Sequence, residues 1–258
     1  MTRGIEAAAA GMVSVVNWND IIANNLANIN TPGFKQTLVS FKDIKELDAN
    51  QIDAAKGYNK TKIGNLSAGS LLDSTVFDFK QGSIKQTGNP LDLAINGDGF
   101  FVVKTPEGEA YTRNGSFIRR DDGIITTVDG YQLIGESGNP INFNINNTKG
   151  QEIKIGKDGT VLIGKEIMDK LKIVDFTDKK NLEAQGNSLF KPANNEAPIK
   201  AAGFEVNQGS LEMANSNAIE SMVNSIHGMR TYETLAKVIE TDNRTLSKTV
   251  NEVGRIKR

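Results

Sequence analysis

The residues that could carry out chemistry in this chain of 258 residues are few and scattered. There is no cysteine, which excludes disulfide bonds and thiolate chemistry. The chain has a single histidine, His227, so any histidine-based metal site or catalytic triad would rest on that residue alone. Gly97-Asp98-Gly99 lacks the third glycine and the following helix of a dinucleotide-binding loop. Acidic pairs such as Asp121-Asp122 fall in expected turns, where aspartate bonds its own backbone. We therefore expect no catalytic, cofactor-binding or metal-binding residues.

Two alternatives to a purely structural role stay open. Hydrolysis of a glycosidic bond needs only two carboxylic acids at the right separation, so a hydrolase built on a β scaffold is one. A soluble binding module that dimerises through helices is the other. The composition, with 38% hydrophobic and 24% charged residues and a net charge of −1, is that of a soluble protein without a field to steer it toward nucleic acid. We expect neither a nucleic-acid partner nor a small-molecule substrate.

Two long helices are predicted at the ends of the chain. From Arg3 to about Asn28, and again within Asn217–Arg258, apolar residues recur in steps of three and four. Thr31-Pro32-Gly33 ends the first helix, because proline disfavours helix in the residue before it. Such seams pack on each other as a coiled coil or on other copies. The expected interface positions are Ile5, Met12, Val15, Asn19, Ile22, Leu26 and Ile29, and then Ile219, Met222, Ile226, Met229, Tyr232, Ile239, Leu246 and Val250.

The run Ala7–Val16 follows Arg3 as the apolar part of a signal peptide would. It is rich in alanine, and the helical spacing continues through it to Ile29. We therefore expect no cleaved signal peptide.

The middle of the chain changes to a period of two, from Gly82 to about Val206. Asn-Gly and Asp-Gly turns recur there, which predicts a domain of short antiparallel strands. Leu91–Ile95 and Phe100–Val103, joined by a glycine-rich turn, predict a hairpin. Phe41, Ile44 and Leu47 could continue a short helix.

The predicted fold class is therefore α+β, with long N- and C-terminal helices forming a coiled coil and a central all-β domain. The expected domains are a discontinuous terminal-helix domain of residues 1–34 and 209–258, an extended connector of residues 35–83 and a β domain of residues 84–208.

The chain also resembles a known family. The stretch Asn24–Lys35 looks like the N-terminal signature of the bacterial flagellar rod, hook and hook-filament axial proteins. Leu93–Phe101 and Tyr111–Phe117 resemble the two central motifs of the rod and hook proteins, and Gly209-Ser210-Leu211-Glu212 and Arg230–Glu233 are similar to their C-terminal region. The residues that carry the N-terminal signature are Asn24, Asn25, Leu26, Ala27, Asn28, Pro32, Gly33 and Phe34.

Within that family, three stretches favour the proximal-rod F-type: Met1–Ile5, Leu133–Ile141 and Val250–Arg255. The distal-rod G-type is the second choice, and a hook-type axial subunit stays an alternative.

The resemblance implies a structural subunit of the flagellar basal-body rod, a drive shaft that transmits torque, and no enzyme activity. The implied partners are other copies of the chain, neighbouring rod and hook axial proteins and the flagellar type III export apparatus. The implied location is the rod in the periplasmic space, reached by export without a cleaved signal peptide.

Overall fold

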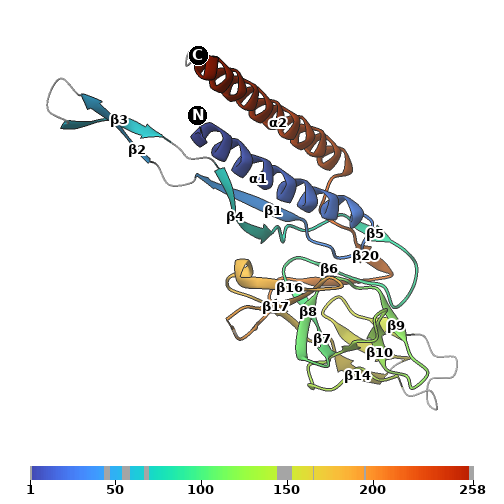
Figure 1. The fold of residues 1–258 in the computed structure, drawn as a ribbon. Coiled ribbons are helices and arrows are strands. Elements are labelled where there is room, and N and C mark those ends of the chain that lie inside the picture. The colour runs from blue at the N-terminus through green and yellow to red at the C-terminus, as the bar shows by residue number, and fades with distance from the viewer. Residues whose placement is uncertain are drawn as a thin grey trace. The chain divides into compact units, whose positions relative to one another are not determined.

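The computed structural model describes residues 2–43, 47–53, 59–66, 70–143, 153–164, 166–194 and 196–255 (Figure 1). The chain divides into two compact units whose residues interleave along the sequence. The helical unit combines Met1–Leu26, Thr37–Val76 and Asn217–Arg258. The β unit combines Ala27–Gln36 and Phe77–Ser216.

The two predicted helices are confirmed. Helix α1 spans Thr2–Ala27 and helix α2 spans Ala218–Arg255. Asn217 caps α2, because its side-chain oxygen accepts a hydrogen bond of 3.0 Å from the backbone N–H of Ile219. Residues 256–258 lie outside the described residues. No described helix is long and apolar enough to span a bilayer.

The helical unit also contains two strand pairs. They are β1 (Thr37–Asp43) with β4 (Ser70–Phe77), and β2 (Leu47–Asp53) with β3 (Asn59–Leu66). The short helix considered around Phe41 is wrong: Phe41 lies in β1 and Leu47 begins β2, while Ile44 lies outside the described residues. Thr37 and Val39 are β-branched residues that favour a strand, and pairing with β4 supplies its backbone hydrogen bonds.

The β unit holds short strands, as the turn signals predict. Its strands are β5 (Ile84–Gln86), β6 (Leu93–Asn96), β7 (Phe100–Thr105), β8 (Gly108–Thr112), β9 (Phe117–Arg119), β10 (Ile125–Thr127), β11 (Gln132–Leu133), β12 (Ile153–Ile155), β13 (Thr160–Ile163), β14 (Glu166–Lys170), β15 (Ile173–Asp175), β16 (Leu182–Gly186), β17 (Leu189–Pro192), β18 (Ile199–Lys200), β19 (Glu205–Gln208) and β20 (Ser210–Glu212).

The largest sheet runs in the order β16-β17-β8-β7-β11-β10-β9, with β15 and β18 joined at β7. A second sheet runs β12-β13-β14, and the pairs β19-β6 and β20-β5 complete the unit. Strand β7 alternates between two cores: Phe101 and Val103 enter a large aliphatic cluster, whereas Phe100 and Val102 enter an aromatic one. The central strand therefore divides the unit into two packed layers.

The predicted hairpin of residues 91–103 is wrong, although both strands exist. Strand β6 pairs with β19, and β7 pairs with β8, β11 and β15. Gly97 and Gly99 adopt φ values of +102° and +136°, which turn the chain from one sheet into another. A short turn signal fixes a change of direction but not the partner of each strand.

The coarse fold class is confirmed: one helix at each end and a central antiparallel β region. The division into domains at residues 34, 84 and 208 stays a proposal. In the structure, residues 27–36, 77–83 and 209–216 are part of the β unit.

Candidate functional site

Within the helical unit, α2 runs antiparallel to α1 along a line of close contacts. A Cβ atom added to Gly11 would lie 3.2 Å from Leu235, and one added to Gly4 would lie 3.3 Å from Asp242. A Cβ added to Gly228 would lie only 2.4 Å from the side-chain oxygen of Asn19. The positions on α2 are seven residues apart, so they form one face of the helix. Small residues let the two backbones approach each other there.

The expected interface positions of α1 are covered to different degrees. Val15 and Ile22 are buried, at 8% and 5% exposure. Ile5, Met12, Asn19 and Leu26 are half-buried. Ile29 is also half-buried, but it lies beyond the end of α1 at Ala27 and belongs to the β unit. The side-chain oxygen of Asn19 is buried and has no hydrogen-bond partner among the described residues. Asn19 is therefore held against Gly228 by packing and not by a hydrogen bond that its side-chain oxygen accepts.

The expected interface positions of α2 lie mostly in solvent. Ile239 and Leu246 are half-buried, and Val250 is 69% exposed. Ile226 is 52% exposed and two positions from Gly228, which is about 200° around a helix. The apolar stripe of α2, as we name this exposed face, consists of Ile219, Met222, Val223, Ile226, Met229 and Tyr232. Helical spacing identified all of these residues except Val223. It did not reveal that Ile226 points away from α1, whereas Met229 and Tyr232 lie beside α1 at the edge of the stripe.

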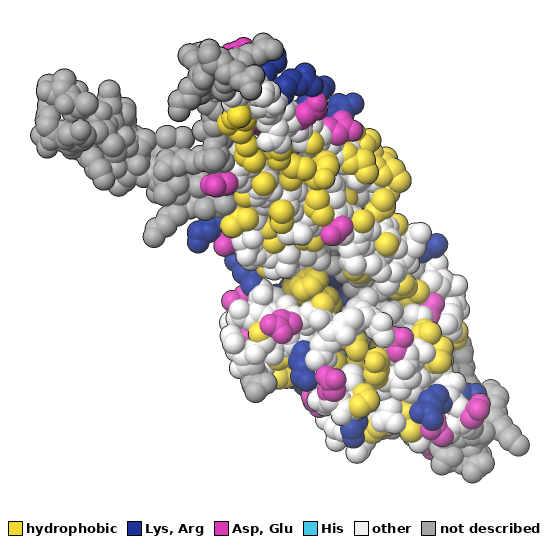
Figure 2. All heavy atoms as spheres, viewed as in Figure 1, with side chains coloured by type: hydrophobic (Ala, Val, Ile, Leu, Met, Phe, Trp, Pro, Cys, Tyr) yellow, Lys and Arg dark blue, Asp and Glu magenta, His cyan; other side chains and the backbone are white. Residues whose placement is uncertain are grey.

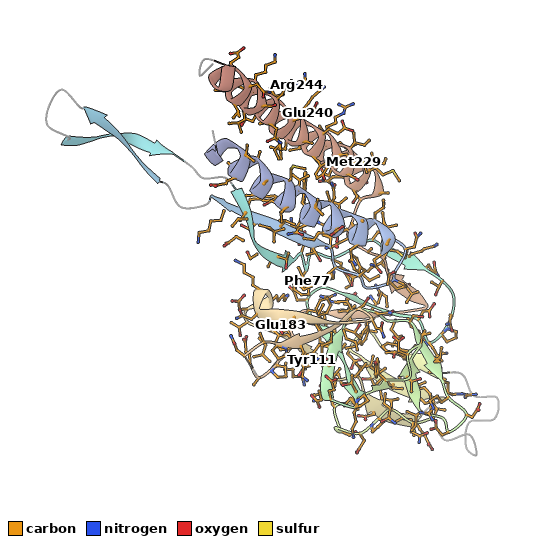
Figure 3. The ribbon with its side chains drawn as sticks, viewed as in Figure 1. Phe77, Tyr111, Glu183, Met229, Glu240 and Arg244 are labelled. Atoms are coloured by element: carbon orange, nitrogen blue, oxygen red, sulfur yellow. The ribbon has the colours of Figure 1, made fainter. Side chains whose placement is uncertain are left out.

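A shallow hollow lies beside this stripe, between the two helices. It has a volume of about 480 Å³ and is open to solvent. It is lined by Val16, Asn19 and Asp20 of α1 and by Met229, Tyr232 and Glu233 of α2. Figure 2 shows hydrophobic side chains gathered over the helices, and Figure 3 labels Met229 on α2. Large exposed apolar patches are rare on monomeric soluble proteins.

The Asn-rich motif at the end of α1 acts within the chain. The Asn25 side chain donates to the Thr37 carbonyl and accepts from the Thr37 N–H, both at 2.9 Å, so it pairs with the start of β1. The Thr31 hydroxyl donates to the Asn28 side-chain oxygen at 3.1 Å. Gly33 has φ +67° and is pressed against the backbone at Arg113, so only glycine fits there. Of the other motif residues, Asn24 and Ala27 are exposed, and Leu26, Pro32 and Phe34 are half-buried.

Directly after this motif, three charged residues meet inside the β unit. The Lys35 ammonium lies 2.7 Å from one oxygen of the Glu212 carboxylate, and the Arg113 guanidinium lies 3.2 Å from the other. Their side chains are 0%, 1% and 3% exposed, in the order Lys35, Glu212, Arg113. Burial lowers the pKa of Lys35 below its usual value, while the charge and hydrogen bond of Glu212 act in the opposite direction.

These three charged residues lie in the sequence motifs that resemble the rod and hook family, but the sequence alone assigned no role to them. Each is the charged member of a stretch otherwise made of turn-forming, apolar or hydroxyl residues: Lys35 after Gly33-Phe34, Arg113 after Tyr111-Thr112, and Glu212 after Ser210-Leu211. That repeated pattern is the signal that could have found them. Their meeting could not be read from it, because it depends on the pairing of β20 with β5.

The residues considered for chemistry have structural partners. Asp122 accepts a hydrogen bond from the Ile124 N–H at 3.1 Å, as a turn residue does. An open hollow of about 390 Å³ in the β unit is lined by Thr105, Pro106, Glu107, Tyr131, Gln185 and Leu189. Among the described residues of that lining, Glu107 is the one carboxylate, whereas acid-base hydrolysis of a glycoside needs two. Among the described residues, no group of three or more histidine, aspartate or glutamate side chains could hold a metal ion.

Known protein families match three stretches of the chain. Residues 19–35 match the flagella basal body rod protein family, residues 94–163 the flagellar hook protein FlgE/F/G D1 domain, and residues 207–252 the flagellar basal body rod FlgEFG protein C-terminal region. Lys35, Arg113 and Glu212 fall one in each stretch.

Whole-length relatives decide the assignment. The chain is 32% identical to the flagellar basal-body rod protein FlgG of Bacillus subtilis, with 97% of this chain and 99% of the relative covered. The chain belongs to the flagellar basal-body rod protein family. It is also 31% identical to the rod protein FlgF of Caulobacter vibrioides, with 92% of each chain covered, and 32% identical to FlgG of Buchnera aphidicola, with 90% of this chain and 92% of the relative covered. The resemblance to rod proteins of the F and G types is thus confirmed, and the preference for the F-type stays a prediction.

Proposed function

We propose that the chain is a structural subunit of the flagellar basal-body rod, that it transmits torque, and that it assembles through its helical unit. The observation that carries the proposal is the apolar stripe of α2. Met229 and Ile226 are more than half exposed, at 59% and 52%. Burying such a side chain contributes about 1.5–3 kcal/mol, so several of them provide a strong drive to associate.

The same geometry supports a coiled-coil arrangement of the terminal helices. One face of α2, with Gly228 and Leu235, follows α1 at heptad spacing, while the stripe is left for helices of other copies or of neighbouring axial proteins. A helix with two such faces can belong to a continuous layer of helices. The terminal-helix domain of residues 1–34 and 209–258 would then be the assembling part and residues 84–208 an outer domain.

Location and export follow from the family and not from a measured site. We place the subunit in the rod of the basal body, within the periplasmic space, after delivery by the flagellar type III export apparatus. Retention of the N-terminal segment is supported by its packing, because Ala8 and Val15 of the run Ala7–Val16 are buried in α1. Removal of that run would remove the middle of the helix.

The substitution that tests assembly is Ile226→Asp. Ile226 is exposed, so the purified monomer should keep its helix content and its melting temperature. A cell whose own copy is deleted should not regain motility with this variant, because the charge would be buried in a subunit contact. Ile22→Asp is a poorer test, since Ile22 is 5% exposed and its loss would unfold the helical unit itself.

Thr234→Asp is the matched control. Thr234 is exposed on the same helix but outside the stripe, so the same new charge should leave assembly intact. Motility in soft agar and basal bodies isolated for electron microscopy would measure the outcome. The proposal is wrong if Ile226→Asp assembles and supports motility as well as Thr234→Asp does.

A further inference from the structure

The buried charges belong to a larger set of contacts that joins three stretches of the β unit. We name it the joint and define it by Gly33, Lys35, Gly82, Arg113, Glu212 and Asn215. Gly33 and Lys35 lie in an N-terminal segment of residues 31–36, just after α1. Glu212 and Asn215 lie in a C-terminal segment of residues 209–216, just before α2. Residues 78–84 run between them and include Gly82.

Glu212 holds the other two stretches at once. Its carboxylate accepts from the Lys35 ammonium at 2.7 Å, from the Gly82 N–H at 2.9 Å and from the Arg113 guanidinium at 3.2 Å. Its backbone carbonyl accepts from the Gly33 N–H at 2.7 Å. The N-terminal segment is therefore bound to this one residue twice, through a side chain and through the backbone.

Asn215, three residues after Glu212, likewise bonds to both of the other stretches. Its side-chain oxygen accepts from the Gln36 N–H at 2.8 Å, and its amide group donates to the carbonyls of Asp78 and Lys80 at 2.7 and 3.1 Å. The Lys35 ammonium also donates to the Lys80 carbonyl at 2.7 Å. Each of the three stretches is thus bonded to both of the others.

Arg113 fixes the carboxylate from the side of the β core. Its guanidinium donates to the carbonyls of Gly97 at 2.8 Å and Ile95 at 3.4 Å and lies 5.4 Å from the centre of the Phe100 ring. Arg113 stays in place when either segment leaves, because these contacts are internal to the core. Glu212 would then keep one cation but lose the other.

We propose that the joint makes docking of the N-terminal and C-terminal segments a single cooperative event, so that both segments are bound to the β unit or both are free. The physical reason is the burial of the charges. Withdrawal of the N-terminal segment takes Lys35 away and leaves the Glu212 carboxylate buried with incomplete pairing, which strongly favours release of the C-terminal segment. The coupling is reciprocal, since a coupling free energy acts equally in both directions. The inference concerns the β unit alone and does not depend on which molecules the helices bind.

Hydrogen exchange of the full chain, followed by NMR at low denaturant concentration, tests the inference. The Asp78 N–H donates to the Gln36 carbonyl and the Met213 N–H donates to the Ser83 carbonyl, both at 2.9 Å, so these two amides report on the N-terminal and the C-terminal segment, respectively. If docking is cooperative, both amides exchange with the same opening free energy and the same dependence on denaturant. Clearly different values in the wild-type protein would overturn the inference without any substitution.

Two variants test the coupling from opposite sides. Lys35→Met lies in the N-terminal segment, and we expect exchange of Met213, in the other segment, to accelerate at least about tenfold. Asn215→Ala keeps all three charges, and we expect exchange of Asp78, which reports on the N-terminal segment, to accelerate by a factor close to that of Met213. Acceleration confined to the substituted segment, or none at all, would contradict cooperative docking.

Lys172→Met is the control for loss of a lysine. Lys172 pairs with Glu109 at 2.8 Å on the surface of the same unit, and neither amide should respond to its replacement. The Ile134 N–H, which donates to the Val102 carbonyl of β7 at 2.9 Å, monitors the core. If Lys35→Met also accelerates exchange of Ile134, the whole unit has opened, and Asn215→Ala together with the wild-type comparison decides the question.

Discussion

Aromatic side chains surround Tyr111 in the second core of the β unit. Its ring packs edge-on against Phe176 with centroids 4.8 Å apart, and Phe77, Phe79, Phe100 and Phe190 complete the cluster (Figure 3). Such edge-to-face pairs add about 0.5–1.5 kcal/mol each beyond the burial of their area. Burial raises the pKa of the Tyr111 hydroxyl above its usual value, and the nearby Glu109 carboxylate adds to the rise.

This raised pKa predicts a loss of stability in alkali. Below pH 10 the hydroxyl is protonated in both the folded and unfolded chain, so its contribution is fully present. Above pH 10 the unfolded chain releases the proton first, and stability falls as the pH rises through the folded-state pKa. Tyr111→Phe keeps the ring packing, so urea unfolding between pH 9 and about 11.5 should show a flatter decline than the wild type. A slope in Tyr111→Phe equal to that of the wild type would contradict the assignment.

Gly115 is a second residue whose identity the packing dictates. A Cβ atom there would lie 1.6 Å from the Leu93 carbonyl oxygen, which is backbone and cannot rotate away. Gly115→Ala must therefore displace β6, and we expect it to lower the free energy of unfolding by about 3 kcal/mol or more. Ser116→Ala, one residue on and half-buried, should cost much less. Urea midpoints of the two variants would measure the difference, and similar midpoints would show that β6 yields easily.

At the scale of elements, the pairing of α1 with α2 depends on two helix glycines in different settings. Gly11 faces the movable end of Leu235, whereas Gly228 faces the Asn19 amide at 2.4 Å from a Cβ position. Both glycines are unfavourable inside a helix by about 1 kcal/mol relative to alanine. The gain in helix propensity on replacement by alanine should therefore stabilise the protein at Gly11, whereas at Gly228 the close contact with Asn19 should cancel it.

This contrast predicts opposite signs for two alanine substitutions. Gly11→Ala should raise the melting temperature of the full chain or leave it unchanged. Gly228→Ala should lower it, because the Asn19 side chain must move and the helices must separate. In an Asn19→Ala background the obstacle is gone, so Gly228→Ala should become stabilising by about 1 kcal/mol. Thermal unfolding followed by circular dichroism at 222 nm measures the melting temperatures of the wild type and the four variants. If Gly228→Ala lowers the melting temperature equally in the Asn19→Ala background, the obstacle is not the Asn19 side chain.

The sequence predicted elements better than their partners. Steps of three and four gave both helices nearly to their ends, because local spacing and the turn at Pro32 determine where a helix runs. The same spacing marked Ile226 and Met229 as an interface but could not say that α2 turns Gly228 toward α1. A pattern of apolar residues identifies a sticky face of a helix, but the close contacts between α1 and α2 are made at glycines, which such a pattern does not include.

Strand pairing was the other limit. Residues 93–96 and 100–103 were predicted as neighbours in a hairpin, but β6 pairs with β19 far along the chain, and β7 forms a hairpin with the next strand, β8. The joint has the same origin, since Lys35 and Glu212 are 177 positions apart. No local pattern contains that distance, so the three charged residues stayed without a role until the strands were placed.

At the scale of the whole molecule, the β unit consists of two pieces of chain, a short one of residues 27–36 and a long one of residues 77–216. The 40 residues between Gln36 and Phe77 belong to the helical unit. Lys35 is part of the short first piece and supplies a buried charge to the second. The fragment that starts at residue 77 therefore lacks a component of its own core.

This completion predicts different stabilities for two fragments. The free energy of unfolding of a fragment of residues 27–216 should exceed that of a fragment of residues 77–216 by about 3–5 kcal/mol, because removal of Lys35 leaves Glu212 incompletely paired. Lys35→Met in the longer fragment should remove most of the difference. Urea unfolding measures the three proteins, and equal stability of the two unsubstituted fragments would show that the N-terminal segment contributes nothing to the β unit.

The chain leaves the β unit at Gln36 and returns at Phe77, and the N–H of the next residue, Asp78, donates to the Gln36 carbonyl at 2.9 Å. For the β unit, residues 37–76 are an insertion whose two ends meet. Strands β2 and β3 inside it are likewise closed on each other, with Asp53 opposite Asn59. A foreign peptide grafted between β2 and β3 would extend a ladder at its open end and leave the β core unstretched. The stretch from 37 to 76 is thus the natural place to carry a fluorescent or affinity label, and the place where length can vary during evolution at the smallest cost.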